Sequence, residues 1–246
     1  MTEKLLSERF ADFEENYKRI QEQIAEAAEG SGRKAADITL LAATKTVPAE
    51  VINHAISMGL SHIGENRVQE LLEKYPALDR EHCDLQFIGQ LQTNKIKYLI
   101  DKVSCIQSID SMKLATELSR LCQKEARRMD VLVEVNIGRE ENKGGVAPEA
   151  LIEFIDEIRL LPGIRVNGLM AVPPICSDTK ELCRYFLGMK QYFVDIKGKS
   201  MDNVNMDCLS MGMSSDFALA ISCGATMVRV GSSLFGAREY KPKLTL

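Results

Sequence analysis

Lys45 ends a continuous run of apolar and small residues that begins at Leu40. A run without alternation is typical of a parallel strand buried on both faces, and Pro48 suits the first turn of a helix that follows. We therefore expect Lys45 at the C-terminal tip of a buried strand, where desolvation favours its neutral amine. Such an amine can form a Schiff base with an aldehyde. The alternative is a surface lysine just past the strand.

Two glycine–serine turns lie near the end of the sequence, and each precedes a predicted helix. They run over 212–216 and 231–233 and contribute the candidate phosphate ligands Ser214, Ser215, Gly231 and Ser232. Free N–H groups at such turns suit a phosphate, although any single serine is also an ordinary helix N-cap. Because both turns fall in the last two strand–helix loops, where barrels often bind phosphate, we expect a phosphate site there.

Arg229 lies between Val228 and Val230 in the last predicted strand. Alternation along a strand puts it on the face opposite both valines. If that face is the barrel mouth, Arg229 is a fixed cation beside a ligand. If it is the helix layer, Arg229 is a structural ion-pair partner, and the sequence leaves both options open.

An imine-forming lysine near a phosphate site indicates a phosphorylated aldehyde as ligand. Pyridoxal 5'-phosphate (PLP) meets both requirements. A sugar-phosphate aldolase would meet them too, but aldolases of this kind commonly carry the lysine on strand six or seven, whereas Lys45 is on strand one.

The pattern around these residues alternates strands and helices without a linker or repeat. The expected strands are 40–45, 62–65, 84–88, 103–109, 131–135, 166–172, 205–211 and 227–230. The expected helices are 3–28, 48–58, 67–75, 94–100, 111–128, 148–161, 179–197 and 215–223, with a last turn at 231–235. Eight such units predict an α/β fold, a single (β/α)8 TIM barrel over 1–246 with an extra N-terminal helix. The rival, an open doubly wound sheet, would normally carry a glycine-rich turn after its first strand.

Composition narrows the class of protein. The 246 residues carry a net charge of -4 without a strongly basic segment, so nucleic acid is not an expected partner. No apolar run approaches the roughly 18 residues of a membrane span, and the polar N-terminus lacks a secretory signal. Seven scattered cysteines without a CxxC pair fit a reducing cytoplasm, and the three histidines lack metal-ligand spacing. We expect a cytoplasmic protein with no metal and no membrane contact.

Seven segments together resemble the pyridoxal phosphate homeostasis (YggS/PROSC, PLP-binding) family across nearly the whole chain. They are Ala43-Thr44-Lys45-Thr46, residues 63–70, residues 87–95, residues 133–137, Gly168-Leu169-Met170-Ala171-Val172-Pro173, residues 209–216 and residues 228–236. Any one of them alone would be weak, whereas the set in this order is highly specific.

The resemblance implies a barrel like the N-terminal domain of alanine racemase, PLP fold type III, with PLP held as a Schiff base on Lys45. It implies that Ser214, Gly231 and Ser232 bind the phosphate and that Arg229 contacts either the phosphate or the pyridine side. Asn66 and Met211 would line the pocket. One departure is Gln86, which stands where the family often has histidine. That difference puts an outer contact in doubt.

Two functions fit the resemblance: a carrier in intracellular PLP homeostasis, and a PLP-dependent amino-acid (alanine-type) racemase. Racemases of this fold take a second base, a tyrosine, from a C-terminal β domain. The sequence ends at Leu246, just after strand eight, and none of its six tyrosines falls at a predicted strand tip. We therefore expect the carrier, without robust catalysis, acting as a monomer with PLP-dependent apoenzymes as recipients. If Arg229 faces the pyridine nitrogen, it would keep that nitrogen unprotonated and suit holding PLP more than turnover.

Overall fold

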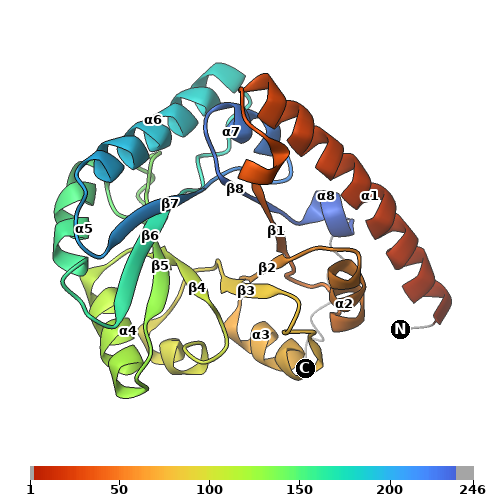
Figure 1. The fold of residues 1–246 in the computed structure, drawn as a ribbon, viewed down its shortest axis with the longest axis horizontal. Coiled ribbons are helices and arrows are strands. Elements are labelled where there is room, and N and C mark those ends of the chain that lie inside the picture. Colours follow the sequence, from red (N-terminus) through yellow and green to blue (C-terminus); the bar gives the residue numbers. More distant parts are fainter. Residues whose placement is uncertain (1–2, 237–246) are drawn as a thin grey trace.

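The computed structural model describes residues 3–236. Its eight strands are all parallel and pair in chain order, and β8 pairs with β1 to close the barrel. Helices surround the ring of strands (Figure 1). The closed barrel confirms the predicted (β/α)8 architecture and excludes the open doubly wound sheet.

The strands and helices follow the predicted alternation. The strands are β1 Thr39–Ala43, β2 His62–Glu65, β3 Asp84–Phe87, β4 Cys105–Ile109, β5 Met129–Glu134, β6 Ile164–Met170, β7 Val204–Ser210 and β8 Met227–Val230. The α-helices are α1 Glu3–Gly30, α2 Ala49–Ser57, α3 Val68–Lys74, α4 Met112–Lys124, α5 Leu151–Ile158, α6 Thr179–Gly198, α7 Phe217–Ser222 and α8 Ser232–Phe235. Short 3₁₀ helices are η1 Ala35–Asp37, η2 Tyr75–Ala77, η3 Thr93–Tyr98 and η4 Pro148–Ala150.

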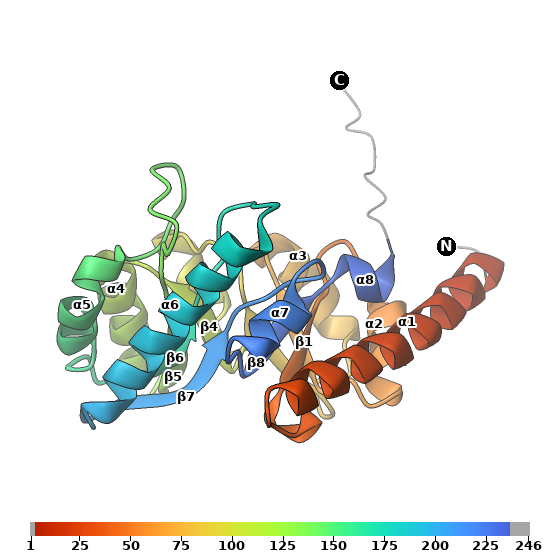
Figure 2. The same cartoon turned by 90° about the horizontal axis from the view of Figure 1, so that it is seen from above.

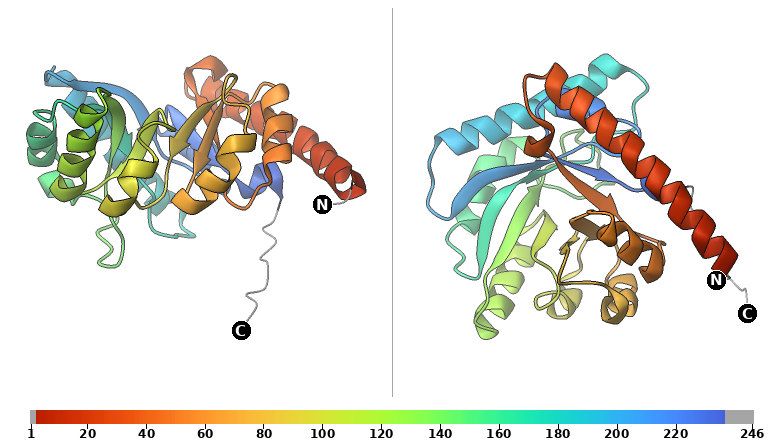
Figure 3. Two further views of the ribbon diagram at one scale, coloured as in Figure 1. Left: turned by 90° about the horizontal axis from the view of Figure 1, so that it is seen from below. Right: turned by 45° about the vertical axis from the view of Figure 1, so that its right-hand side comes forward.

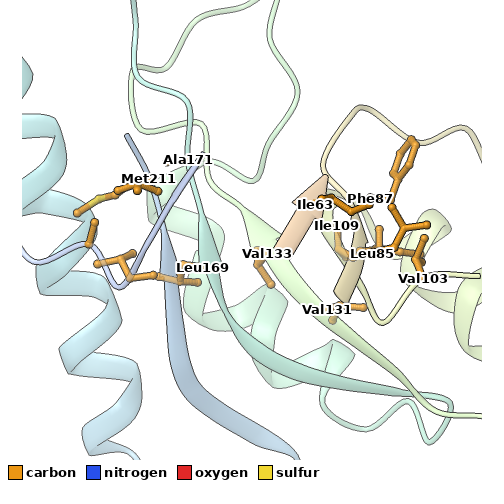
Figure 4. Packing of buried hydrophobic residues seen from close by; sticks show 14 of the residues in the cluster. Ile63, Leu85, Phe87, Val103, Ile109, Val131, Val133, Leu169, Ala171 and Met211 are labelled. Atoms are coloured by element: carbon orange, nitrogen blue, oxygen red, sulfur yellow. The ribbon is translucent and has the colours of Figure 1, made fainter. Parts of the chain in front are cut away.

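Alternation along the strands divides the apolar side chains into two layers. Val131 and Val133 of β5 belong to the large cluster between strands and helices, part of which is shown in Figure 4. Leu132, between them, packs instead with Cys105 and Met170 in a small separate cluster. The rest of the barrel interior is partly polar, which leaves room for the buried groups of a site.

Helix α1 precedes the first strand and packs on the outside of the barrel. Phe13, Tyr17 and Ile20 are among its buried residues, at the spacing of one apolar face. The helix lies along α2, α7 and α8, as Figures 1 and 3 show. The ring of Phe13 stacks on that of Phe235, with 5.4 Å between centroids. This packing joins the N-terminal helix to α8, the helix that follows the last strand.

Among the elements whose bounds or type differ from the expectation are β1, η3 and α1. Strand β1 ends at Ala43 because the N–H of Val47 bonds the carbonyl of Thr44 at 2.9 Å and closes a turn. Lys45 therefore lies in a turn two residues past the strand, and the prediction that it ends the strand was wrong. The expected helix 94–100 is the 3₁₀ helix η3, with Leu99 N–H bonded to Ile96 O at 2.9 Å. Helix α1 continues through Gly30.

Three properties of the described part of the chain bear on function. None of the helices in residues 3–236 combines the length and apolar character that a membrane crossing needs. Within the same residues, His, Cys, Asp and Glu side chains form no group that could hold a metal ion. All seven cysteines are free thiols.

Candidate functional site

The pairing of β8, β1 and β2 brings the predicted site residues to one edge of the barrel. Ala42 pairs with Val230, and Ala43 pairs with Gly64. The turn after β1, which holds Lys45, therefore lies between Asn66, which follows β2, and Gly231, which follows β8. The loops after β5 and β6 project from one face of the barrel (Figure 2). In parallel barrels the C-terminal ends of the strands carry the active site.

Lys45 is half-buried in a turn, Thr44–Val47, that we call the Lys45 turn. Thr46, its next residue, has a φ of 65°, in the left-handed region that β-branched residues rarely adopt. Backbone strain of this kind persists only where surrounding contacts impose it. The turn thus has a defined shape that other elements must hold.

The two glycine–serine turns meet at one hydroxyl oxygen. Ser214 Oγ accepts hydrogen bonds from the N–H of Gly231 at 3.2 Å and the N–H of Ser233 at 3.3 Å. Ser233 Oγ donates to the carbonyl of Ser214 at 3.3 Å. We call Ser214, Gly231 and Ser233 the anion cradle, because converging N–H and O–H groups suit a phosphate oxygen.

Glycine at position 231 allows this cradle to lie beside β1. A Cβ built on Gly231 would be 3.1 Å from the carbonyl oxygen of Ala43, two residues before Lys45. The cradle and the Lys45 turn are therefore immediate neighbours, as a ligand with both a phosphate and an aldehyde requires.

Asp216 fixes the first glycine–serine turn. Its Oδ1 accepts a 2.6 Å hydrogen bond from the N–H of Met213. Burial raises the pKa of the Asp216 carboxyl, while this hydrogen bond and the charge of Arg229 act in the opposite direction. Gly212, with a φ of 93°, starts the turn in a conformation that favours glycine.

The other predicted ligands are placed differently. Ser215 and Ser232 are exposed, and the hydroxyls that join the two turns are those of Ser214 and Ser233. Met211 is fully buried in the outer apolar layer (Figure 4), so its backbone is the part that can face a ligand. Oδ1 of Asn66 is buried and has no hydrogen-bond partner among the described residues.

Arg229 faces the barrel interior, which resolves the choice that alternation left open. Its side chain is 5% exposed, and Nη1 donates to Ser210 Oγ at 2.6 Å while Nη2 donates to Ala171 O at 2.9 Å. Burial lowers the pKa of Arg229 to about 10, and the nearby Glu134 carboxylate is the largest opposing cause. Arg229 is therefore a fixed, largely desolvated cation at neutral pH.

A chain of hydrogen bonds continues from Arg229 through the barrel. Ser210 Oγ donates to Gln107 Oε1 at 2.7 Å, and Gln107 Nε2 donates to Gln86 Oε1 at 2.6 Å. Gln86 Nε2 then donates to Asp84 Oδ2 at 2.8 Å. Gln86, the departure from the family pattern, is a buried member of this chain and is linked to Arg229 through Gln107 and Ser210.

Sequence reasoning missed a polar cluster behind the Lys45 turn, formed by Glu65, Glu70 and Lys74. Lys74 Nζ lies 2.8 Å from Glu65 Oε1 and 2.6 Å from Glu70 Oε1. Glu65 is fully buried, and burial raises the pKa of its carboxyl, with Lys74 as the largest opposing cause. The available signal was the i,i+4 spacing of Glu70 and Lys74 on α3. That spacing is also common on solvated helix faces, so it could not identify the contact with the Lys45 turn.

Comparison with known proteins gives consistent similarities. The family model described as alanine racemase, N-terminal domain, matches residues 11–239. The chain is 45% identical over 226 residues to the pyridoxal phosphate homeostasis protein of Aquifex aeolicus (strain VF5), covering 92% of this chain and 98% of that protein. It is 36% identical over 235 residues to the protein of the same name from Escherichia coli (strain K12), covering 94% and 99%. The solved structure of PipY from Synechococcus elongatus PCC7942, with PLP bound, has a TM-score of 0.76 and 31% identity and covers 87% of this chain and 100% of that one.

Proposed function

The chain belongs to the pyridoxal phosphate homeostasis protein family, and from this membership we propose that it binds PLP through Lys45 and serves intracellular PLP homeostasis. Support comes from relatives with this name, of which the match covers 98–99%, and from a similar structure solved with PLP bound. The proposal treats residues 1–246 as one PLP-binding domain.

The observation that carries the proposal is the anion cradle beside the Lys45 turn. Two backbone N–H groups converge on Ser214 Oγ and fix this hydroxyl, whose own proton would be donated to a phosphate oxygen. Asn66, whose buried Oδ1 lacks a partner among the described residues, stands on the other side of the Lys45 turn. The donors of the anion cradle and the nearby Lys45 amine therefore fit a ligand that carries an anionic phosphate and a group able to react with an amine.

When bound, PLP supplies an aldehyde that condenses with a primary amine, and its ring can act as an electron sink. We assign the amine to Lys45 and the phosphate contacts to Ser214, Gly231 and the neighbouring Ser215 and Ser232. Asn66 and the backbone at Met211 would border the ring.

We assign Arg229 to the ring side. Its two Nη atoms are bonded to Ser210 and Ala171, whereas the cradle is formed by other groups. A permanent cation there would keep the pyridine nitrogen unprotonated, because two adjacent positive charges repel. Such an environment favours storage of the cofactor over carbanion chemistry.

The racemase remains the alternative, since the matching family model is that of alanine racemase. Its two-base chemistry would need a second proton-transfer group opposite Lys45. The tyrosines of the described residues lie on helical elements, on α1, η2, η3 and α6; Tyr240 lies outside those residues. Location in the cytoplasm, a monomeric state and delivery to PLP-dependent apoenzymes complete the proposal, and the free cysteines are compatible with a reducing compartment.

A single preparation distinguishes the two functions. The purified protein is titrated with PLP, followed by visible absorption, and then mixed with a PLP-requiring aminotransferase in its apo form. The proposal predicts a saturable absorption band, recovery of aminotransferase activity, and no D-alanine from L-alanine at rates of about 1 s⁻¹ or more, the lower end for enzymes. A protein that racemises alanine at such rates would establish the alternative. A protein that shows no spectral change with PLP would contradict both functions.

A further inference from the structure

The backbone on both sides of Lys45 is bonded to one ion pair of helix α3. Lys74 Nζ donates to the carbonyl oxygen of Thr44 at 2.8 Å. The N–H of Thr46 donates to Glu70 Oε1. Because Lys74 and Glu70 are themselves bonded at 2.6 Å, the peptide groups before and after Lys45 are held by a single charged unit.

The ion pair is anchored from behind by a third charged group. Glu65 Oε1 lies 2.8 Å from Lys74 Nζ and also accepts a 2.7 Å hydrogen bond from Thr44 Oγ1. The side chains of Glu65, Lys74 and Glu70 are 0%, 12% and 17% exposed. Ion pairs so removed from water add little net stability, because desolvation offsets their attraction. In this chain their hydrogen bonds fix the peptide groups on both sides of Lys45.

The conformation of the Lys45 turn shows why such fixing is needed. Thr46 is held in the left-handed region, and the carbonyl of Thr44 accepts from both Val47 N–H and Lys74 Nζ. Without the hydrogen bonds to Glu70 and Lys74, Thr46 would relax towards the conformations that a β-branched residue prefers. Such relaxation would rotate the peptide groups that set the direction of the Lys45 side chain.

We propose that Glu70 and Lys74 are positioning residues that hold the Lys45 turn in the shape needed for the Lys45 amine to reach the aldehyde of PLP. This inference rests on the proposed function. Condensation forms one carbon–nitrogen double bond, with the amine losing two hydrogens and the aldehyde its oxygen, which leave as water. The amine must meet the carbonyl carbon within a narrow range of distance and angle, so small displacements have large effects.

The test compares two ligands on the variant Lys74→Met, which keeps an unbranched side chain one atom shorter and removes its charge and donors. PLP and pyridoxine 5'-phosphate share the ring and phosphate, but only PLP carries an aldehyde. Misplacement of an amine costs up to about a hundredfold in reactivity, so we expect PLP to bind at least about tenfold more weakly and to react more slowly. Affinity for pyridoxine 5'-phosphate should stay within about twofold of the wild type, because neither ring nor phosphate contacts Lys74 in the proposed arrangement.

Two further variants separate positioning from general damage. Glu70→Gln retains an acceptor for the N–H of Thr46 and should keep most of the PLP affinity, whereas Glu70→Leu should behave like Lys74→Met. Lys4→Met breaks an exposed i,i+4 pair with Glu8 at the far end of α1 and should change neither affinity.

The outcomes separate the inference from the function on which it rests. Equal loss of both ligands in Lys74→Met, or unchanged PLP affinity, would overturn the positioning role while leaving PLP binding by the wild type intact. A wild-type protein that binds pyridoxine 5'-phosphate and PLP equally, without a visible band, would instead overturn the proposed function.

Discussion

The guanidinium of Arg229 donates a 2.6 Å hydrogen bond to the hydroxyl oxygen of Ser210, and both side chains are buried. The Ser210 hydroxyl in turn donates its own proton to Gln107 Oε1. One hydroxyl therefore accepts from a cation and donates to an amide oxygen. The neighbouring strands β7 and β8 thus hold Arg229 in a single orientation at the site. The link is open to test by mutation.

Replacing Ser210 with alanine should destabilise the fold. The change leaves Arg229 Nη1 and Gln107 Oε1 without their shared partner in a buried place, which typically costs about 1–3 kcal/mol. Urea unfolding at neutral pH measures the loss. Ser108→Ala is the matched control, because Ser108 Oγ is buried without a hydrogen-bond partner among residues 3–236. Equal stability of Ser210→Ala and Ser108→Ala would show that the Ser210 contact adds nothing.

The N-terminal helix should be an integral part of the barrel. Phe13 is fully buried and stacks on Tyr17 and Phe235, at centroid distances of 5.3 and 5.4 Å. Phe13→Ala should therefore lower the free energy of unfolding by about 3–5 kcal/mol, the usual cost of removing a buried aromatic ring. Thermal unfolding followed by circular dichroism measures it. A change no larger than that of the exposed substitution Leu5→Ala would show that α1 packs only loosely.

Glu65 should make stability depend on pH in a defined direction. Burial raises the pKa of its carboxyl above 4.5, with the charge of Lys74 as the largest opposing cause. The folded state then binds the proton more tightly than the unfolded state, so the contribution of Glu65 to stability is fully present below about pH 4.5 and is lost as pH rises through the folded pKa. The free energy of unfolding of Glu65→Gln, minus that of the wild type, should accordingly increase with pH above 4.5.

Urea unfolding of both proteins between pH 4 and pH 8 measures this difference. Glu73→Gln, an exposed substitution on α3 next to Lys74, is the control. A difference that stays flat or falls with rising pH would contradict the raised pKa.

Ser214 should contribute to the preference for a phosphorylated ligand. Its hydroxyl brings the two glycine–serine turns together, so Ser214→Ala should weaken PLP while leaving pyridoxal, which lacks the phosphate, almost unaffected. Hydrogen bonds to charged groups are worth about 1.5–3 kcal/mol. The dissociation constant for pyridoxal divided by that for PLP should therefore fall by about tenfold or more. Absorption titrations give both constants, and Ser222→Ala, at the exposed end of α7, is the control. A ratio unchanged by Ser214→Ala would place the phosphate elsewhere.

Local sequence determined much of this fold and part of the site. The bounds of β2 and β8 match their predicted ranges, because clear turn signals flank both short apolar runs. The end of β1 was predicted too late because Thr44 and Lys45 belong to a turn closed by a backbone hydrogen bond that no residue pattern announces. The glycine–serine turns were found by composition, but the use of Ser233 beside Ser214 depends on how two loops meet.

The features of the site that the sequence did not predict depend on contacts between residues far apart in the chain. Alternation along β8 gave Arg229 two possible faces, and only closure of the barrel showed that it reaches Ser210 and Ala171. Lys74 lies 30 residues from Thr44 in the chain, so its contact with the Lys45 turn depends on the packing of α3 against β2. Such a contact has no signature in either segment alone.

The central claim is that Lys45 is the amine that holds PLP. The direct measurement is to saturate the protein with PLP, reduce it with sodium borohydride so that the bond to the lysine becomes permanent, and locate the modified peptide by mass spectrometry. We predict one modified residue, Lys45, and no modification of the Lys45→Arg variant under the same conditions. Modification of Lys95 or Lys143 in place of Lys45 would contradict the claim.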